Sequence, residues 1–234
     1  MKKKLAELNI KLSALSIFRD LLRDPVIAAF QNLMAALEDK ELLQQVYAYG
    51  EFVSCLYQKE SNLSTYIRNL ILNDENFYVK EKAAEAPVSQ TVETALKKEL
   101  DTLEKLSAVT SEAVKSVIAY KGFLPDWETA PFDFHYEYRE RIHRLPYTGY
   151  GIYAKYTVFH LENGSIQPVK HPDTQSLSQL FGYERERGLI LKNTEALLSG
   201  EGASNMLLYG DAGTGKSSTI KAVCNHYGPQ GLRL

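Results

Sequence analysis

Residues 210–217 read Gly-Asp-Ala-Gly-Thr-Gly-Lys-Ser, which matches the phosphate-binding pattern G-x-x-x-x-G-K-[ST]. The glycines allow a tight backbone turn whose successive N–H groups point inward, and these donors favour a phosphate at the start of a helix. Lys216 would add a positive charge at the β- and γ-phosphates, and Ser217 a hydroxyl ligand for Mg²⁺. The residues predicted to form this site are Gly210, Asp211, Ala212, Gly213, Thr214, Gly215, Lys216, Ser217 and Ser218.

The flanking sequence fits the same site. An apolar run at 205–209, Asn-Met-Leu-Leu-Tyr, predicts a strand buried on both faces. Residues 218–226 predict a helix with Ile220, Val223 and Cys224 on one face. Strand, glycine-rich loop and helix in this order form the arrangement that a P-loop requires, which argues against a chance match. The sequence therefore predicts binding of a nucleoside triphosphate with Mg²⁺.

Few residues follow Lys216. A P-loop ATPase also needs a strand ending in carboxylates, which hold Mg²⁺ through water and orient the attacking water. No residue after Lys216 fits that role, and Gly-Leu-Arg-Leu at 231–234 is typical of a strand that is beginning. We expect an incomplete nucleotide domain, with no catalytic residue and no ATPase activity in this chain alone. A naturally short protein with a minimal site is the alternative.

Composition places the chain among ordinary globular proteins. It is 44% hydrophobic and 24% charged, with a formal net charge of −2, so no general attraction to nucleic acid or anionic membrane is predicted. Two cysteines, Cys55 and Cys224, lie far apart in predicted helices, which favours reduced thiols. The basic residues 2–4 are not followed by the apolar stretch of a signal peptide, and no run is long enough to span a bilayer. We expect a cytoplasmic protein.

Residues 1–122 predict a helical N-terminal domain. Asp24 followed by Pro25 marks a helix start, after which apolar residues recur at helical spacing. Helices are predicted over 25–37, 39–59, 64–72, 92–106 and from 110 to a stop at Gly122. Because each has one apolar face, the helices must pack on one another or on a partner, and a helical bundle is expected.

Residues 123–149 are rich in proline and aromatic residues. We interpret this segment as a linker whose aromatic side chains pack onto neighbouring domains. In the alternative interpretation, its aromatic and basic side chains stack on bases and contact phosphates of a nucleic acid. His135 and His143 have no nearby Cys or His partner, so no metal site is predicted here.

Residues 150–170 predict a β-hairpin, because bulky residues alternate from Ile152 onward. The turn is predicted at Asn163-Gly164, since both residue types tolerate positive φ. Pro168 cannot donate to a ladder, which places the second strand at an edge.

The predicted fold class is α/β with a large all-α N-terminal region. The domains are a helical bundle at 1–122, the linker at 123–149, the hairpin at 150–170 and the start of a P-loop nucleotide-binding domain at 171–234. Within the last of these, a helix is predicted at 183–198, before the strand and the loop.

Several segments carry a resemblance to a known family. They are Leu-Phe-Gly-Tyr-Glu at 180–184, Asn-Thr at 193–194, the string from 207 to 218, and 231–234. They resemble a bacterial family of predicted AAA+ ATPases, labelled domain of unknown function 815, of which this chain would be an N-terminal part. The resemblance is close over 176–234 and weak elsewhere. The Gly-Tyr-Glu segment at its distance from the loop distinguishes this family from other P-loop proteins.

The resemblance implies an AAA+ fold, ATP and Mg²⁺ as ligands, and a homo-oligomeric assembly of the full-length protein. It also implies that Phe181, Gly182 and Tyr183 lie beside the adenine. The expected function is ATP hydrolysis coupled to remodelling or moving a protein or nucleic-acid partner. The alternative is a non-catalytic helical interaction module with a vestigial nucleotide site. A small-molecule kinase fits less well, because such enzymes usually start close to their P-loop.

Overall fold

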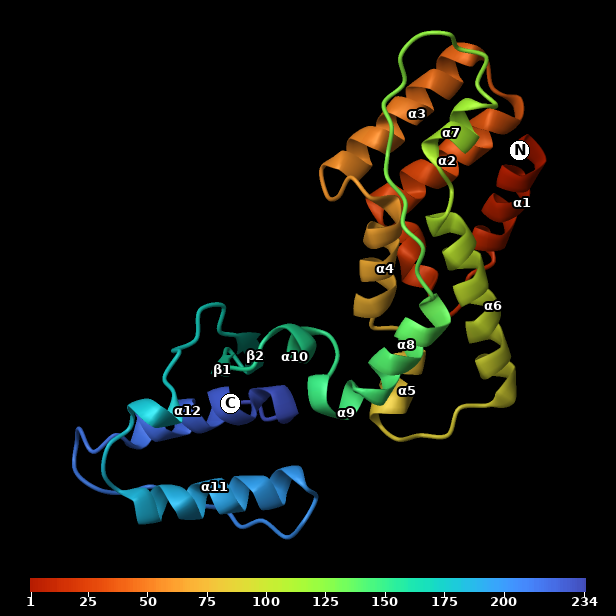
Figure 1. Cartoon of the computed structure of the whole chain (residues 1–234). Helices are drawn as coiled ribbons and strands as arrows, with labels where there is room; N and C mark the ends of the chain where they lie inside the picture. The colour runs from red at the N-terminus through yellow and green to blue at the C-terminus, as the bar shows by residue number, and fades with distance from the viewer. The chain divides into compact units, whose positions relative to one another are not determined.

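The computed structural model describes all residues from 1 to 234, which fold into two compact units. The first unit is Met1–His143 and the second is Arg144–Leu234 (Figure 1). Helices predominate in both units, and the named strands form one short antiparallel hairpin. The expected combination of a large helical region with a short hairpin is therefore confirmed.

The named elements of the first unit are all helical, and four of its eight α-helices coincide closely with the predicted ranges. Its elements are α1 (Lys2–Ser13), the 3-10 turn η1 (Arg19–Arg23), α2 (Pro25–Asp39), α3 (Leu42–Tyr57), α4 (Leu63–Asn73), α5 (Phe77–Ala83), α6 (Gln90–Ser107), α7 (Ser111–Lys115) and α8 (Phe134–His143). The last helix expected from the sequence is much shorter than predicted. It ends at Lys115 instead of near Gly122, because the N–H groups of Val117 and Ile118 turn back to carbonyls three residues earlier.

Polar side chains fix the starts of several helices. Asp24 accepts hydrogen bonds from the N–H groups of Val26 and Ile27 at 3.0 and 3.1 Å, and Pro25 occupies the first helical position as predicted. The same capping role is taken by Asn62, Asn76, Ser89 and Thr110.

Three aromatic rings form the centre of the first unit. Phe30 of α2 and Phe52 of α3 lie with ring centroids 4.5 Å apart, and the indole of Trp127 packs edge-on against Phe52 at 5.0 Å. All three are buried. Burying a side chain of this size contributes about 1.5–3 kcal/mol, so this cluster stabilises the α2–α3 pair and the segment that carries Trp127.

A buried carboxylate ties α6 to the turn between α1 and η1. Glu99 accepts hydrogen bonds from the N–H groups of Ser16, Ile17 and Phe18 and from the Ser16 hydroxyl, at 2.6–3.2 Å. These donors replace the water that the carboxylate loses on burial, so the charge remains satisfied inside the unit.

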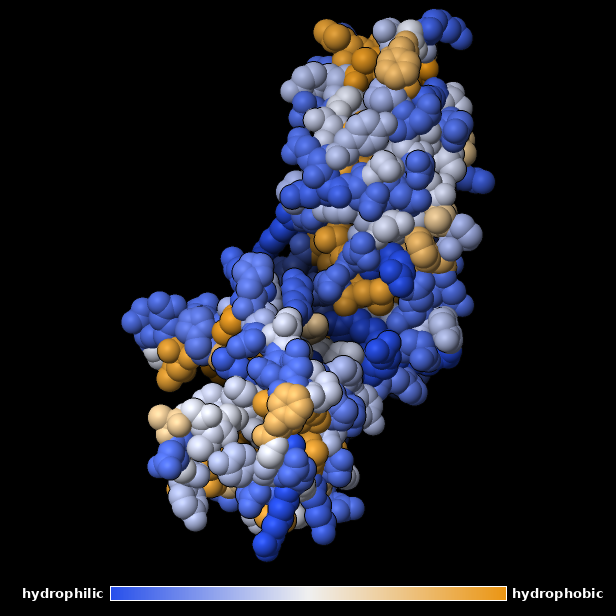
Figure 2. Space-filling model, turned by 60° about the vertical axis from the view of Figure 1, so that its left-hand side comes forward, coloured by the Kyte–Doolittle hydropathy of each residue, from blue (hydrophilic) through white to orange (hydrophobic).

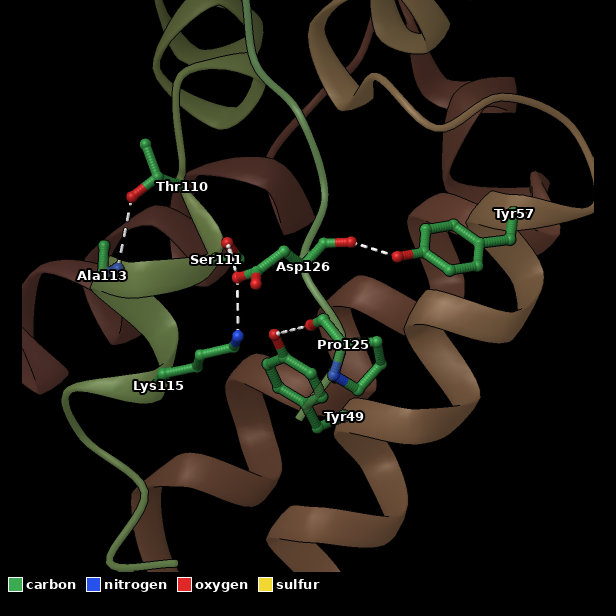
Figure 3. Close-up of polar contacts among 8 residues, drawn as sticks. All are labelled: Tyr49, Tyr57, Thr110, Ser111, Ala113, Lys115, Pro125 and Asp126. Carbon is green, nitrogen blue, oxygen red and sulfur yellow. Dashed lines mark hydrogen bonds and ion pairs between the residues drawn. The ribbon is translucent and has the colours of Figure 1, made fainter. Parts of the chain in front are cut away.

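The predicted linker is bound to the helices along its first half (Figure 3). The hydroxyl of Tyr49 donates to the carbonyl of Pro125 at 2.6 Å, and that of Tyr57 donates to the carbonyl of Asp126. Both tyrosines come from α3, so this helix holds two successive carbonyls of the crossing segment.

The side chain of Asp126 points the other way, toward α7 (Figure 3). Its carboxylate accepts from Ser111 Oγ at 2.7 Å and from Lys115 Nζ at 2.6 Å. The hydrogen bond from Lys115 and that from Ser111 hold the pKa of Asp126 below its usual value. Asp126 therefore joins α7 to α3 through one residue of the segment.

The aromatic residues at 123–149 include both buried and exposed rings. Trp127, Phe134 and Tyr138 are buried, and Trp127 Nε1 donates to the carbonyl of Val109 at 2.9 Å. The three buried rings cannot stack on bases, which favours the packing interpretation for them, whereas Phe123, Tyr136 and Tyr147 are exposed.

The second unit contains four helices, two 3-10 turns and the hairpin. Its elements are α9 (Leu145–Thr148), α10 (Ile152–Lys155), β1 (Phe159–Glu162), β2 (Ser165–Pro168), η2 (Leu177–Gln179), α11 (Glu184–Leu198), α12 (Lys216–Tyr227) and η3 (Gly228–Gln230). The predicted helices at 183–198 and 218–226 correspond to α11 and α12.

The hairpin has the predicted turn but shorter strands. Phe159 pairs with Pro168 and Glu162 with Ser165, and Asn163 and Gly164 have φ of 49° and 76°, as a two-residue turn of this type requires. The expected strand from Ile152 is wrong, because α10 occupies that position. The alternation of bulky residues from Ile152 is typical of a strand, but no other segment pairs with residues 152–155.

The chain beyond η3 returns to β1. Leu234 donates its N–H to the carbonyl of Thr157 at 2.9 Å and accepts from the N–H of Phe159 at 2.6 Å. These two bonds have the pattern of parallel strand pairing. Within the strand expected at 231–234, only Leu234 pairs with the chain at 157–159 in this way.

In no case is a helix of the structure both long and apolar enough to cross a membrane. Figure 2 shows a largely hydrophilic face of the helical unit, with apolar side chains gathered at its upper end, where Figure 1 draws the loop that follows α7. Large exposed apolar residues of this unit include Leu43, Tyr47 and Phe123.

Candidate nucleotide site

The segment that leads into the glycine-rich loop is not a strand. Residues 205–209 belong to no sheet, so the prediction of a strand there is wrong. The prediction of burial on both faces is also wrong, because Leu207 is 85% and Tyr209 89% exposed. Leu208 alone of these packs against the core between α11 and α12. The N–H groups of 205–209 have no acceptor in the protein, and without a neighbouring strand the ladder cannot form.

The loop itself has the conformation that its glycines permit. Gly210, Gly213 and Gly215 have φ of 143°, 82° and 80°, values at which a residue with a Cβ would be strained. An added Cβ at Gly213 or Gly215 would meet no atom within 4 Å, so the space beside the loop is open. The backbone N–H groups of 211–218 have no acceptor in the protein. The loop thus presents a series of free donors, which is what binding an anion requires.

Lys216 lies across the loop. Its Nζ donates to the carbonyls of Gly210 and Asp211 at 2.9 and 2.6 Å and to Thr214 Oγ1 at 3.2 Å. Thr214 Oγ1 in turn donates to the carbonyl of Asp211 at 2.9 Å. Because three acceptors fix the ammonium, its positive charge is already placed at the loop before any ligand arrives.

Helix α12 begins directly after the loop, with Gly215 as its N-cap residue. Ser217 and Ser218 therefore lie in its first turn, where N–H groups have no partner within the helix. Ser217 is exposed, so its hydroxyl is free to meet a ligand. The structure contains no group of three or more His, Cys, Asp or Glu side chains that could hold a metal ion.

Helices α11 and α12 are held together beside the loop. Tyr227 of α12 donates its hydroxyl to Glu195 of α11 at 2.6 Å, and both helices contribute to a core of Ile190, Val223 and Tyr227. Burial, together with the bond to Glu195, raises the pKa of Tyr227 to about 12.

A cleft of about 540 Å³ lies between α11, the segment at 206–209 and the start of α12. Its size is that of a pocket for a small organic ligand. Its lining residues are Tyr183, Glu186, Arg187, Leu189, Ile190, Met206, Leu207, Leu208, Tyr209, Thr214, Lys216 and Thr219. The cleft therefore combines an apolar wall with the charged residue of the glycine-rich loop.

Comparison with known proteins identifies the part of the chain that carries this site. Residues 153–234 match the family described as "Protein of unknown function (DUF815)". This part of the chain is a DUF815 domain. The match begins before the hairpin, so the family extends further upstream than the close resemblance at 176–234. No curated protein and no solved structure matches the chain.

Three residues of the DUF815 domain are expected beside the adenine, and one of them, Tyr183, lies near the glycine-rich loop. Tyr183 lines the cleft together with Lys216. Phe181 is 90% exposed, and neither it nor Gly182 is among the lining residues. Gly182 and Tyr183 have φ of 71° and 58°, which turn the chain into α11.

Five residues of α11 and its N-cap line the cleft of the DUF815 domain, Leu189 among them, and sequence reasoning singled out only Tyr183. Tyr183, Glu186, Arg187 and Ile190 are spaced i, i+3, i+4 and i+7, which places them on one helix face. That spacing was the signal that could have identified them once Tyr183 was assigned to the site.

Proposed function

We propose that this protein binds ATP with Mg²⁺ through the loop at 210–218. The observation that carries the proposal is the pairing of free N–H donors at 211–218 with a fixed ammonium on Lys216, beside a cleft of ligand size. An anion with several oxygens can accept from the free N–H groups and take the place of loop acceptors on the Lys216 ammonium.

Each group has a distinct part in this proposal. The N–H groups of the loop and of the first turn of α12 bind phosphate oxygens, and Lys216 binds oxygens of the β- and γ-phosphates. Ser217 supplies a hydroxyl ligand for Mg²⁺, which when bound neutralises charge on the phosphate chain. Tyr183 packs against the base, and Phe181 and Gly182 adjoin it in sequence. Phe181 and Gly182 would reach the base only if the turn before α11 closes.

We further propose that the DUF815 domain belongs to an AAA+ ATPase that acts as a homo-oligomer in the cytoplasm. The resemblance at 180–184 and 207–218 supports this class, and two free cysteines are consistent with a reducing compartment. ATP hydrolysis would be coupled to remodelling or moving a partner held by the helical unit.

One observation favours a non-catalytic alternative. No carboxylate forms a hydrogen bond or an ion pair with Lys216 or Ser217, whereas hydrolysis needs a group that orients water. In this alternative the helical unit is an interaction module and the nucleotide site is vestigial. Phosphate release from ATP separates the two: turnover that Lys216→Ala abolishes supports the ATPase, and ATP binding without turnover supports the module.

Calorimetric titration with ATP and Mg²⁺ tests the binding site itself. We expect Lys216→Ala to weaken ATP binding by roughly tenfold or more, because it removes a charged donor to the phosphates. Lys221→Ala is the matched control, since Lys221 lies on the same helix but pairs with Asp173 at 3.1 Å. Equal ATP affinity in the Lys216 and Lys221 variants would contradict the assignment.

A further inference from the structure

Arg187 is a largely buried cation with no hydrogen-bond acceptor. Its side chain is 16% exposed, and its one ion-pair contact is with Glu184 Oε1 at 3.7 Å, which exceeds hydrogen-bond distance. The Glu184 side chain is 80% exposed, so it stays solvated rather than enclosing the guanidinium. None of the five side-chain N–H donors of Arg187 is hydrogen-bonded within the protein, and its nitrogens are not fully enclosed, so these donors remain accessible to a ligand.

The position of Arg187 places these donors where a ligand in the cleft could accept from them. The residue lines the same cleft as Lys216, so the cleft contains two cations. The one carboxylate among its lining residues is Glu186. A polyanion in this cleft could accept from the unpaired N–H donors of Arg187 and could also contact the Lys216 ammonium.

Of the two arginines at the start of α11, only Arg187 lines the cleft. Arg185 lies on the same turn of α11, is exposed, and is not among the lining residues. The two arginines thus share a helix and a charge, and differ in whether they face the cleft.

We propose that Arg187 is a second phosphate-binding residue of the cleft, which contacts the polyphosphate chain of the nucleotide opposite Lys216. This inference rests on the proposed function, because it assigns a further contact in the same site. A guanidinium presents a planar pair of donors that matches two phosphate oxygens, so its contribution requires geometry as well as charge.

The test compares ATP with inorganic tripolyphosphate, each titrated with Mg²⁺ into the unaltered protein and into Arg187→Met, Arg187→Lys and Arg185→Met. We expect Arg187→Met to weaken both ligands by roughly tenfold, and Arg187→Lys to weaken them less. Arg185→Met should change neither. Thermal melting shows whether each variant folds. If Arg187→Met does not fold, the ligand affinities of Arg187→Lys are compared with those of the unaltered protein instead.

Three outcomes would overturn the inference. If Arg187→Met weakens ATP but not tripolyphosphate, Arg187 serves the base instead of the phosphates. If both ligands bind Arg187→Met normally while Lys216→Ala fails to bind, the site is correct and Arg187 is not part of it. If the unaltered protein binds neither ligand, the proposed function fails and the inference with it.

Discussion

Asn193 and Ser204 are joined by two hydrogen bonds that run in opposite directions. Asn193 Nδ2 donates to the carbonyl of Ser204 at 2.8 Å, and the N–H of Ser204 donates to Asn193 Oδ1 at 2.9 Å. The Asn193 side-chain amide thus satisfies both backbone polar groups of Ser204, as a neighbouring strand would. Because the following residues 205–209 have no ladder, this pair anchors the chain to α11 just before it enters the cleft and the loop.

Replacing Asn193 should therefore loosen the approach to the loop. We expect Asn193→Ala to lower the free energy of unfolding by about 1 kcal/mol, and Asn193→Asp by less because it keeps the acceptor. Hydrogen exchange at the Ser204 amide should become faster in Asn193→Ala. Asn205→Ala is the control, since its exposed side chain makes no hydrogen bond. Unchanged exchange at Ser204 would show that the pair does not hold the segment.

Glu99→Gln should destabilise the helical unit more strongly. Glu99 is 8% exposed and accepts from three N–H groups and one hydroxyl, and a glutamine would turn an NH₂ group toward those donors. We expect a loss of about 1–3 kcal/mol in urea unfolding. Lys97→Gln, on the exposed side of α6, should be near neutral. A loss for Glu99→Gln no larger than for Lys97→Gln would contradict this role.

Asp126 should give stability a pH dependence at acid pH. Lys115 and then Ser111 lower its pKa in the folded state, so the pair stabilises the fold above the usual Asp value of 3.8. This contribution is lost as the pH falls through the folded-state pKa. Since the Asp126 side chain is 64% exposed, screening limits the effect to less than about 1 kcal/mol.

The corresponding experiment is urea unfolding of the unaltered protein and of Asp126→Asn at neutral pH and near pH 3. We expect Asp126→Asn to be the less stable at neutral pH, with the difference shrinking in acid. Glu112→Gln, an exposed carboxylate on the same short helix, should show no such convergence. A difference that stays constant between the two pH values would exclude an ionic contribution from Asp126.

Local signals predicted the parts of the molecule that depend on nearby residues. Asp24 with Pro25 set the start of α2, and Asn163-Gly164 set the hairpin turn, because each acts on its own backbone. The glycine-rich loop and the start of α12 were predicted for the same reason.

Features that depend on distant partners could not be predicted in this way. Residues 205–209 have the composition of a strand, but a strand forms only where a neighbour pairs with it. In the sequence, Glu99 cannot be distinguished from the other charged residues of its helix. Its role depends on the N–H groups of residues 16–18, which are distant in the chain. For Arg187, the sequence offers only its helical spacing from Tyr183, and its place in the cleft becomes clear once α11 is seen beside the loop.

An amide NMR titration with ATP and Mg²⁺ tests the central claim most directly, because it observes the free N–H groups of the loop. We expect the largest shifts at the amides of 211–218, where no acceptor competes for the donors, and we expect Lys216→Ala to reduce them at equal ATP. Unchanged amides at 211–218 under saturating ATP, or shifts confined to the helical unit, would contradict a phosphate site in this loop.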